Sequence, residues 1–65
     1  MQNEKASIFT AEQEQSLRQL KTYFPYRIVW GAVNSNGEFE QHADYDRRKL
    51  YRYLRNREWL VATIE

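Results

Sequence analysis

The chain has 65 residues, with ten lysines and arginines against nine aspartates and glutamates, a single histidine and no cysteine. This length accommodates one small domain, and the near-balance of charge excludes both a uniformly basic histone-like protein and an acidic nucleic-acid mimic. The lack of cysteine excludes disulfides and thiolate metal sites and suits a cytoplasmic location, and no stretch approaches the roughly 20 apolar residues of a membrane span. We predict a flexible N-terminus over residues 1–7 and one domain over residues 8–65.

Residues 10–24 carry the signals of an amphipathic helix. Thr10 and Gln13 match a capping box, in which the threonine hydroxyl accepts from the backbone three residues on and the glutamine reaches back. Pro25 disfavours helical geometry at the preceding residue, so the helix is expected to end near residue 23 or 24. Three apolar residues recur at helical spacing and are expected to face the core: Leu17, Leu20 and Phe24.

A β-hairpin is predicted after this helix, with strands over residues 26–33 and 38–43. The first strand is rich in β-branched and aromatic residues, and Asn36-Gly37 favours a tight turn. A loop of two residues and a loop of four residues place the same residues of the two strands on a common face. One face is then expected to carry the core residues Tyr26, Ile28, Trp30, Ala32, Phe39, Gln41 and Ala43. The opposite face carries Arg27, Val29, Gly31, Val33, Glu38, Glu40 and His42.

A second helix is predicted from Asp46 to about residue 58, capped by Asp44 or Asp46. Its expected buried stripe falls within one arc: Leu50, Tyr51, Tyr53 and Leu54. A third strand is predicted over residues 59–64, and alternation divides it into two faces. Leu60, Ala62 and Ile64 share one face, and Trp59, Val61 and Thr63 share the other.

The order helix, strand, strand, helix, strand predicts an α+β fold. The simplest solution places the first strand between the second and the third in an antiparallel sheet of order 2-1-3. We expect both helices to cover one face of this sheet in a two-layer sandwich. The other face would then remain open.

No pattern typical of an enzyme is present. The sequence lacks a nucleophile elbow, a P-loop and dinucleotide-binding glycines, and nothing predicted encloses His42 in a concave site. Glu40, His42 and Asp44 could ligate a divalent cation, but side chains two apart on a flat strand stand about 7 Å from each other. We therefore expect no catalytic residues, no metal and no cofactor.

Protein binding through the open sheet face is the favoured function. If the leucine face of the third strand points to the helices, Trp59 and Val61 join Val29 and Val33 outside. An apolar strip with a charged rim is typical of a partner surface. The partner would be another protein or a second copy of the chain, and no membrane is expected. The predicted protein-binding residues are Arg27, Val29, Val33, Glu38, Glu40, His42, Trp59 and Val61.

Nucleic-acid binding is the alternative. Six of the ten basic residues lie between positions 47 and 57. Arg48, Arg52 and Arg55 share one side of the predicted helix, and the planar guanidinium suits phosphate better than an ammonium does. A charged helix face is also often merely solvated, so salt-dependent retention on DNA or RNA is the observation that separates the two functions.

Overall fold

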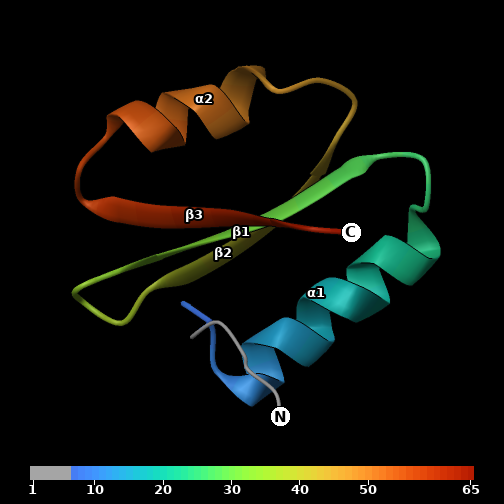
Figure 1. The fold of residues 1–65 in the computed structure, drawn as a ribbon, viewed down its shortest axis with the longest axis horizontal. Helices are drawn as coiled ribbons and strands as arrows, with labels where there is room; N and C mark the ends of the chain where they lie inside the picture. Colours follow the sequence, from blue (N-terminus) through green and yellow to red (C-terminus); the bar gives the residue numbers. More distant parts are fainter. Residues whose placement is uncertain (1–6) are drawn as a thin grey trace, which may run out of the picture.

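The computed structural model describes residues 7–65, which form two helices and three strands (Figure 1). In chain order these elements are α1 (Ala11–Tyr23), β1 (Ile28–Asn34), β2 (Phe39–Asp44), α2 (Arg48–Arg55) and β3 (Trp59–Ile64). The strands form one antiparallel sheet in the order β2-β1-β3, which confirms the predicted α+β fold and strand order. The prediction for residues 1–6 lies outside the described residues.

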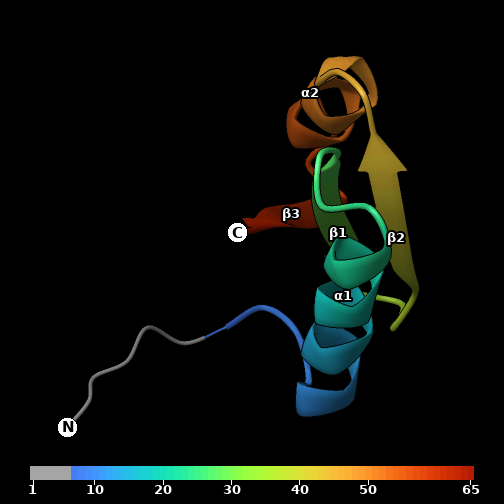
Figure 2. The same cartoon turned by 90° about the vertical axis from the view of Figure 1, so that its right-hand side faces the viewer.

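The two helices lie on opposite faces of the sheet, so the predicted two-layer arrangement is wrong. Figure 1 shows α2 on one side of the strands and α1 on the other, and Figure 2 shows the same separation after a quarter turn. The core is accordingly divided in two. Phe9, Leu17 and Val29 form the part beneath α1, and Trp30, Ala32 and Leu50 form the part beneath α2.

The central strand β1 is apolar from Ile28 to Val33 because it is buried on both faces. Val29 and Trp30 are consecutive and therefore point to opposite faces, yet both are fully buried. A continuous apolar run is typical of a strand covered on two sides, whereas a strand with one open face alternates. Residues 28–33 form such a continuous apolar run. The prediction of one open sheet face did not take this run into account.

The hairpin loop reverses the expected pairing of faces. Val33 pairs with Phe39 and Trp30 with His42, which leaves a loop of three residues, Ser35 to Gly37. The Gly37 amide donates to the Asn34 carbonyl at 3.1 Å, and Gly37 has a φ of 81°. This is a type I turn followed by a left-handed glycine, a common three-residue hairpin loop. Compared with a loop of two or four residues, a loop of three residues places every side chain of the second strand on the opposite face of the sheet.

The start of α1 is confirmed as a capping box. The Thr10 hydroxyl accepts from the Gln13 amide at 3.1 Å, and the Gln13 side chain accepts from the Thr10 amide at 2.9 Å. The helix ends at Tyr23, as Pro25 predicts. Leu17 is buried, as predicted. Phe24 was predicted to face the core, but it is 37% exposed.

The second helix is shorter than predicted and buries a narrower stripe. It begins at Arg48, whose amide donates to the Asp46 side chain at 3.0 Å. Leu50 is buried and Tyr53 half-buried, whereas Tyr51 and Leu54 are 51% and 55% exposed. A helix that rests on one sheet face needs only a narrow apolar stripe, and the remaining apolar side chains stay in solvent.

Candidate functional site

The predicted apolar strip does not exist, because its four members lie on opposite faces of the sheet. Val29 is fully buried and Val33 half-buried, both on the α1 side. Trp59 and Val61 pack beneath α2, against the cluster of Trp30, Ala32 and Leu50. The three-residue hairpin loop and the two-sided covering of the sheet together remove the surface on which the protein-binding prediction depended.

Two members of the predicted charged rim fasten α2 to the sheet instead. The His42 ring stacks on Trp30 with centroids 4.3 Å apart, and its Nε2 lies 3.2 Å from Glu40 Oε1. The Tyr53 hydroxyl of α2 donates to the same Glu40 oxygen at 2.5 Å. The hydrogen bonds from Tyr53 and His42 lower the pKa of Glu40, and the bond to Glu40 raises the pKa of Tyr53. Glu40 and His42 therefore contact other residues of the protein and do not form a free rim.

The other rim residues lie apart from this network. The Glu38 carboxylate accepts from the Asn34 side chain in the hairpin turn. Arg27 precedes β1, so it lies at the other end of the hairpin, where its guanidinium contacts Tyr45. The structure therefore does not bring the predicted protein-binding residues together.

Metal-ligand clusters and membrane-spanning helices are absent from residues 7–65. No group of three or more histidine, aspartate or glutamate side chains in this range is placed to hold a metal ion. No helix within it combines the length and apolar character needed to cross a membrane.

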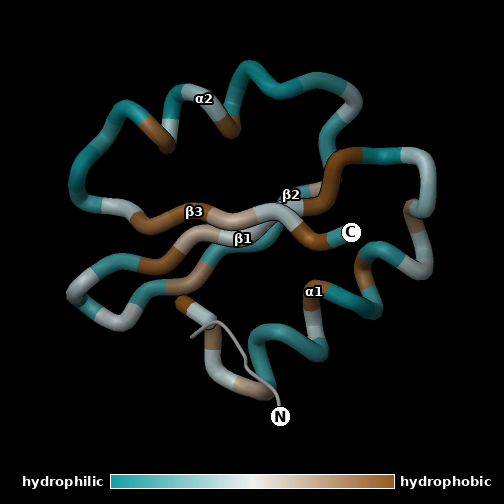
Figure 3. Tube along the Cα trace, viewed as in Figure 1, coloured by the Kyte–Doolittle hydropathy of each residue, from teal (hydrophilic) through white to brown (hydrophobic). Residues whose placement is uncertain are grey.

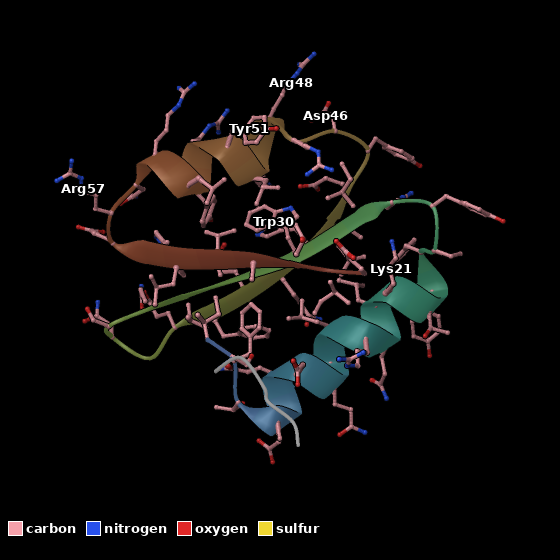
Figure 4. The ribbon with its side chains drawn as sticks, viewed as in Figure 1. Lys21, Trp30, Asp46, Arg48, Tyr51 and Arg57 are labelled. Atoms are coloured by element: carbon pink, nitrogen blue, oxygen red, sulfur yellow. The ribbon has the colours of Figure 1, made fainter. Side chains whose placement is uncertain are left out.

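The outer side of α2 carries three arginines, Arg48, Arg52 and Arg55, which we call the arginine face. All three are exposed, and buried Leu50 lies on the opposite side of the helix. Figure 4 shows Arg48 pointing away from the sheet. Its Nε lies 3.7 Å from Asp46, a pair too exposed, at 89% and 61%, to hold the arginine strongly. Within the described part of the chain, Arg52 and Arg55 form no ion pair.

The charges within the first turn of α2 oppose the helix dipole, whereas the Asp46 carboxylate just before the helix accepts from the Arg48 amide. Arg47 is the N-cap and makes no side-chain capping bond, Arg48 and Lys49 follow, and the first turn contains no acidic residue. A cation near a helix N-terminus costs stability of roughly 0.3–1 kcal/mol. Figure 3 shows the hydrophilic character of α2, interrupted only by a few apolar positions.

A second exposed surface, which we call the aromatic–arginine cluster, consists of Phe24, Arg27 and Tyr45, together with Tyr26, which neighbours Arg27 in the chain. The Arg27 guanidinium lies 4.5 Å from the Phe24 ring centroid and 4.3 Å from that of Tyr45, and it donates to the Tyr45 hydroxyl at 2.6 Å. Tyr26 is 98% exposed and Tyr45 80% exposed. Sequence reasoning placed Tyr26 and Phe24 in the core, although their position beside Pro25 is a signal that they lie in a loop.

Cations also gather next to this cluster. Lys21, Arg27 and Arg47 line an open pocket of about 420 Å³, together with Glu65. The Lys21 ammonium at the end of α1 donates to the Arg27 backbone carbonyl at 3.1 Å, which holds the Lys21 side chain against the α1–β1 loop. An anion at this pocket would meet three positive groups and one carboxylate.

No protein-family model, curated protein or solved structure matches this chain. Function is therefore inferred from the surfaces of the molecule itself. The arginine face and the aromatic–arginine cluster expose side chains that the core does not use.

Proposed function

We propose that this chain is a non-enzymatic nucleic-acid-binding module that contacts the phosphate backbone through the arginine face of α2. The observation that carries the proposal is the exposure of Arg48, Arg52 and Arg55 on one side of a single helix. Arg52 and Arg55 have no carboxylate partner among residues 7–65, so their guanidinium groups are available to an external anion. Arginine forms bidentate, charge-assisted hydrogen bonds with phosphate.

The spacing of the arginines fits a phosphate backbone. A helix rises 1.5 Å per residue, so Arg48 and Arg55 are about 10 Å apart along the axis, roughly three phosphate steps of one strand measured along the axis of a duplex. Tyr51 lies three residues after Arg48 and four before Arg55, so it borders both on the helix surface. Its ring is 51% exposed and adds a stacking or hydrogen-bonding group to the face.

The helix is also held in place before any ligand binds. Leu50 is buried against Trp30 and Ala32, and the Tyr53 hydroxyl is tied to Glu40 of β2. A surface that is already ordered loses little conformational entropy on binding. This anchoring supports a preformed site on the outer side of α2.

Protein association stays a prediction, but its expected apolar surface is not assembled in this fold. A protein partner on the arginine face would have to be acidic, because that face is cationic. An acidic polypeptide is thus the competing ligand that the experiment must include. A cytoplasmic location also stays an expectation.

Binding of fluorescein-labelled dT12 and of its duplex with dA12, measured by fluorescence anisotropy across a salt series, tests the proposal. Three phosphate contacts predict a slope of log K against log salt of about −2 for the single strand, or roughly a 20-fold loss between 50 and 200 mM salt. The triple variant Arg48→Gln, Arg52→Gln, Arg55→Gln is expected to lose most of this affinity and nearly all of the slope.

A matched control variant on α1 distinguishes the effect of losing the arginine face from the effect of lowering the net charge. The variant Gln15→Glu, Arg18→Gln, Gln19→Glu changes three exposed residues and lowers the net charge by as much as the α2 variant does. It is expected to bind nearly as wild type. Equal losses in both variants, or no binding of either oligonucleotide by the wild-type chain, would contradict the proposal. Equal or tighter binding of poly-glutamate would assign the face to an acidic protein instead.

A further inference from the structure

Resting on the proposed function, we infer that the aromatic–arginine cluster stacks unpaired bases and makes the module selective for single-stranded nucleic acid. Aromatic side chains usually bury about 150–250 Å² each, and a domain this small needs that burial for its core. Tyr26 and Tyr45 are instead 98% and 80% exposed, at the end of the sheet where the α1–β1 and β2–α2 loops meet (Figure 1).

The geometry around Tyr45 leaves one ring face ready for a base. Arg27 lies between the Phe24 and Tyr45 rings, at 4.5 Å and 4.3 Å from their centroids. The hydrogen bond from Arg27 to the Tyr45 hydroxyl, at 2.6 Å, anchors the outer end of that side chain next to the guanidinium. A base on the outer face of Tyr45 would continue an existing stack of ring, guanidinium and ring. Every base has a π-face, so such stacking tolerates any sequence.

The cluster is continuous with the arginine face. Tyr45 precedes Arg48 by three residues, and Arg47 between them lines the pocket that Lys21 and Arg27 also line. A strand with one base on Tyr45 would therefore pass from this pocket onto α2. Among the described residues that line the pocket, Glu65 carries a side-chain carboxylate, which opposes an anion there.

Base pairing distinguishes the possible ligands of this surface. Bases in a duplex are stacked on one another and expose only their edges, whereas single-stranded bases can turn out onto aromatic rings. The arginine face alone would bind either form through phosphates. Selectivity for the single strand would come from the tyrosines.

The anisotropy measurement with dT12 and its duplex tests the inference through two further variants. In Tyr26→Leu, Tyr45→Leu the apolar bulk remains but the ring is lost, and affinity for dT12 is expected to fall at least fivefold while duplex affinity stays within twofold. In Tyr26→Phe, Tyr45→Phe the ring remains, so dT12 affinity is expected to stay within twofold of wild type. Circular dichroism checks that both variants fold.

The outcomes separate the inference from the proposed function. Equal wild-type affinity for dT12 and the duplex, with no loss in the leucine variant, would overturn the inference and leave the arginine face standing. An equal loss for both ligands in a folded leucine variant would also overturn it, because stacking predicts a single-strand effect. Absence of binding to both ligands would overturn the proposed function and the inference together.

Discussion

At Gly31 the side chains of α1 lie directly against the backbone of β1. A Cβ at this position would lie 2.9 Å from Leu17 Cδ1 and 3.0 Å from Cζ of Phe9, which precedes α1, so any side chain here requires these two buried side chains to shift. We expect Gly31→Ala to lower the free energy of unfolding by about 1–3 kcal/mol, measured by urea denaturation. Gly37→Asn is the control, because asparagine tolerates the left-handed turn and nothing lies within 4 Å. Wild-type stability of Gly31→Ala would mean that α1 does not pack on this face.

The Tyr53–Glu40 hydrogen bond predicts a pH dependence of stability with a defined sign. The pKa of Glu40 is lowered from 4.5, so its contribution is present above 4.5 and is lost as the pH falls through the lowered value. The pKa of Tyr53 is raised from 10.0, so its contribution is present below 10 and is lost as the pH rises through the raised value. Glu40 is 41% exposed, and solvent keeps the effect small.

Urea denaturation of wild type and Tyr53→Phe between pH 2 and pH 7 checks the acid limb of this dependence. The wild-type chain is expected to be the more stable of the two near neutral pH, and the difference is expected to shrink below pH 4.5. A difference that stays constant from pH 7 to pH 2 would contradict the role of ionised Glu40, and coincident curves would show that the bond contributes nothing in solution.

At the scale of the elements, two leucines of α2 differ in how much of each side chain is buried. Leu50 is 3% exposed beneath the helix and Leu54 is 55% exposed beside it. Leu50→Ala is expected to cost about 2–5 kcal/mol, a large part of the stability of a domain this size. Leu54→Ala is expected to cost less than about 1 kcal/mol. Thermal unfolding followed by circular dichroism measures both, and equal losses would contradict the way α2 docks on the sheet.

The elements predicted best from the sequence are those with local signals. The Thr10 capping box, the end of α1 before Pro25 and the limits of β3 are confirmed because each depends on neighbouring residues. The faces of the hairpin were predicted wrongly because one extra loop residue at Ser35–Gly37 reverses every pairing. The apolar run at residues 28–33 indicated that both sheet faces are covered, but which helix covers which face depends on contacts distant in sequence.

The two candidate surfaces also differ in whether they are formed by residues close together or far apart in the sequence. The arginine face follows from the spacing of Arg48, Arg52 and Arg55 within one helix, and the structure confirms that all three are exposed. The aromatic–arginine cluster joins Arg27 to Tyr45, 18 residues apart in the chain. Only the folded hairpin brings them together, so sequence patterns could not assign this cluster.

At the scale of the whole molecule, the charge is unevenly distributed although the chain is nearly neutral. Six of ten basic residues but two of nine acidic residues lie between positions 46 and 58, on and around α2. Both faces of the sheet are covered, so the central strand is not available to a partner. The outer side of α2 and the adjoining loops carry exposed arginines and tyrosines.

Mapping the bound surface by NMR is the most direct test of this account. The ¹H–¹⁵N correlation spectrum of the labelled chain would be recorded during titration with dT12 at low salt. We predict that the largest shifts fall on residues 45–55, including the arginine side-chain Nε signals of Arg48, Arg52 and Arg55, with further shifts at Tyr26 and Arg27. Shifts confined to α1 or to the outer edges of β2 and β3, or none at saturating oligonucleotide, would contradict it.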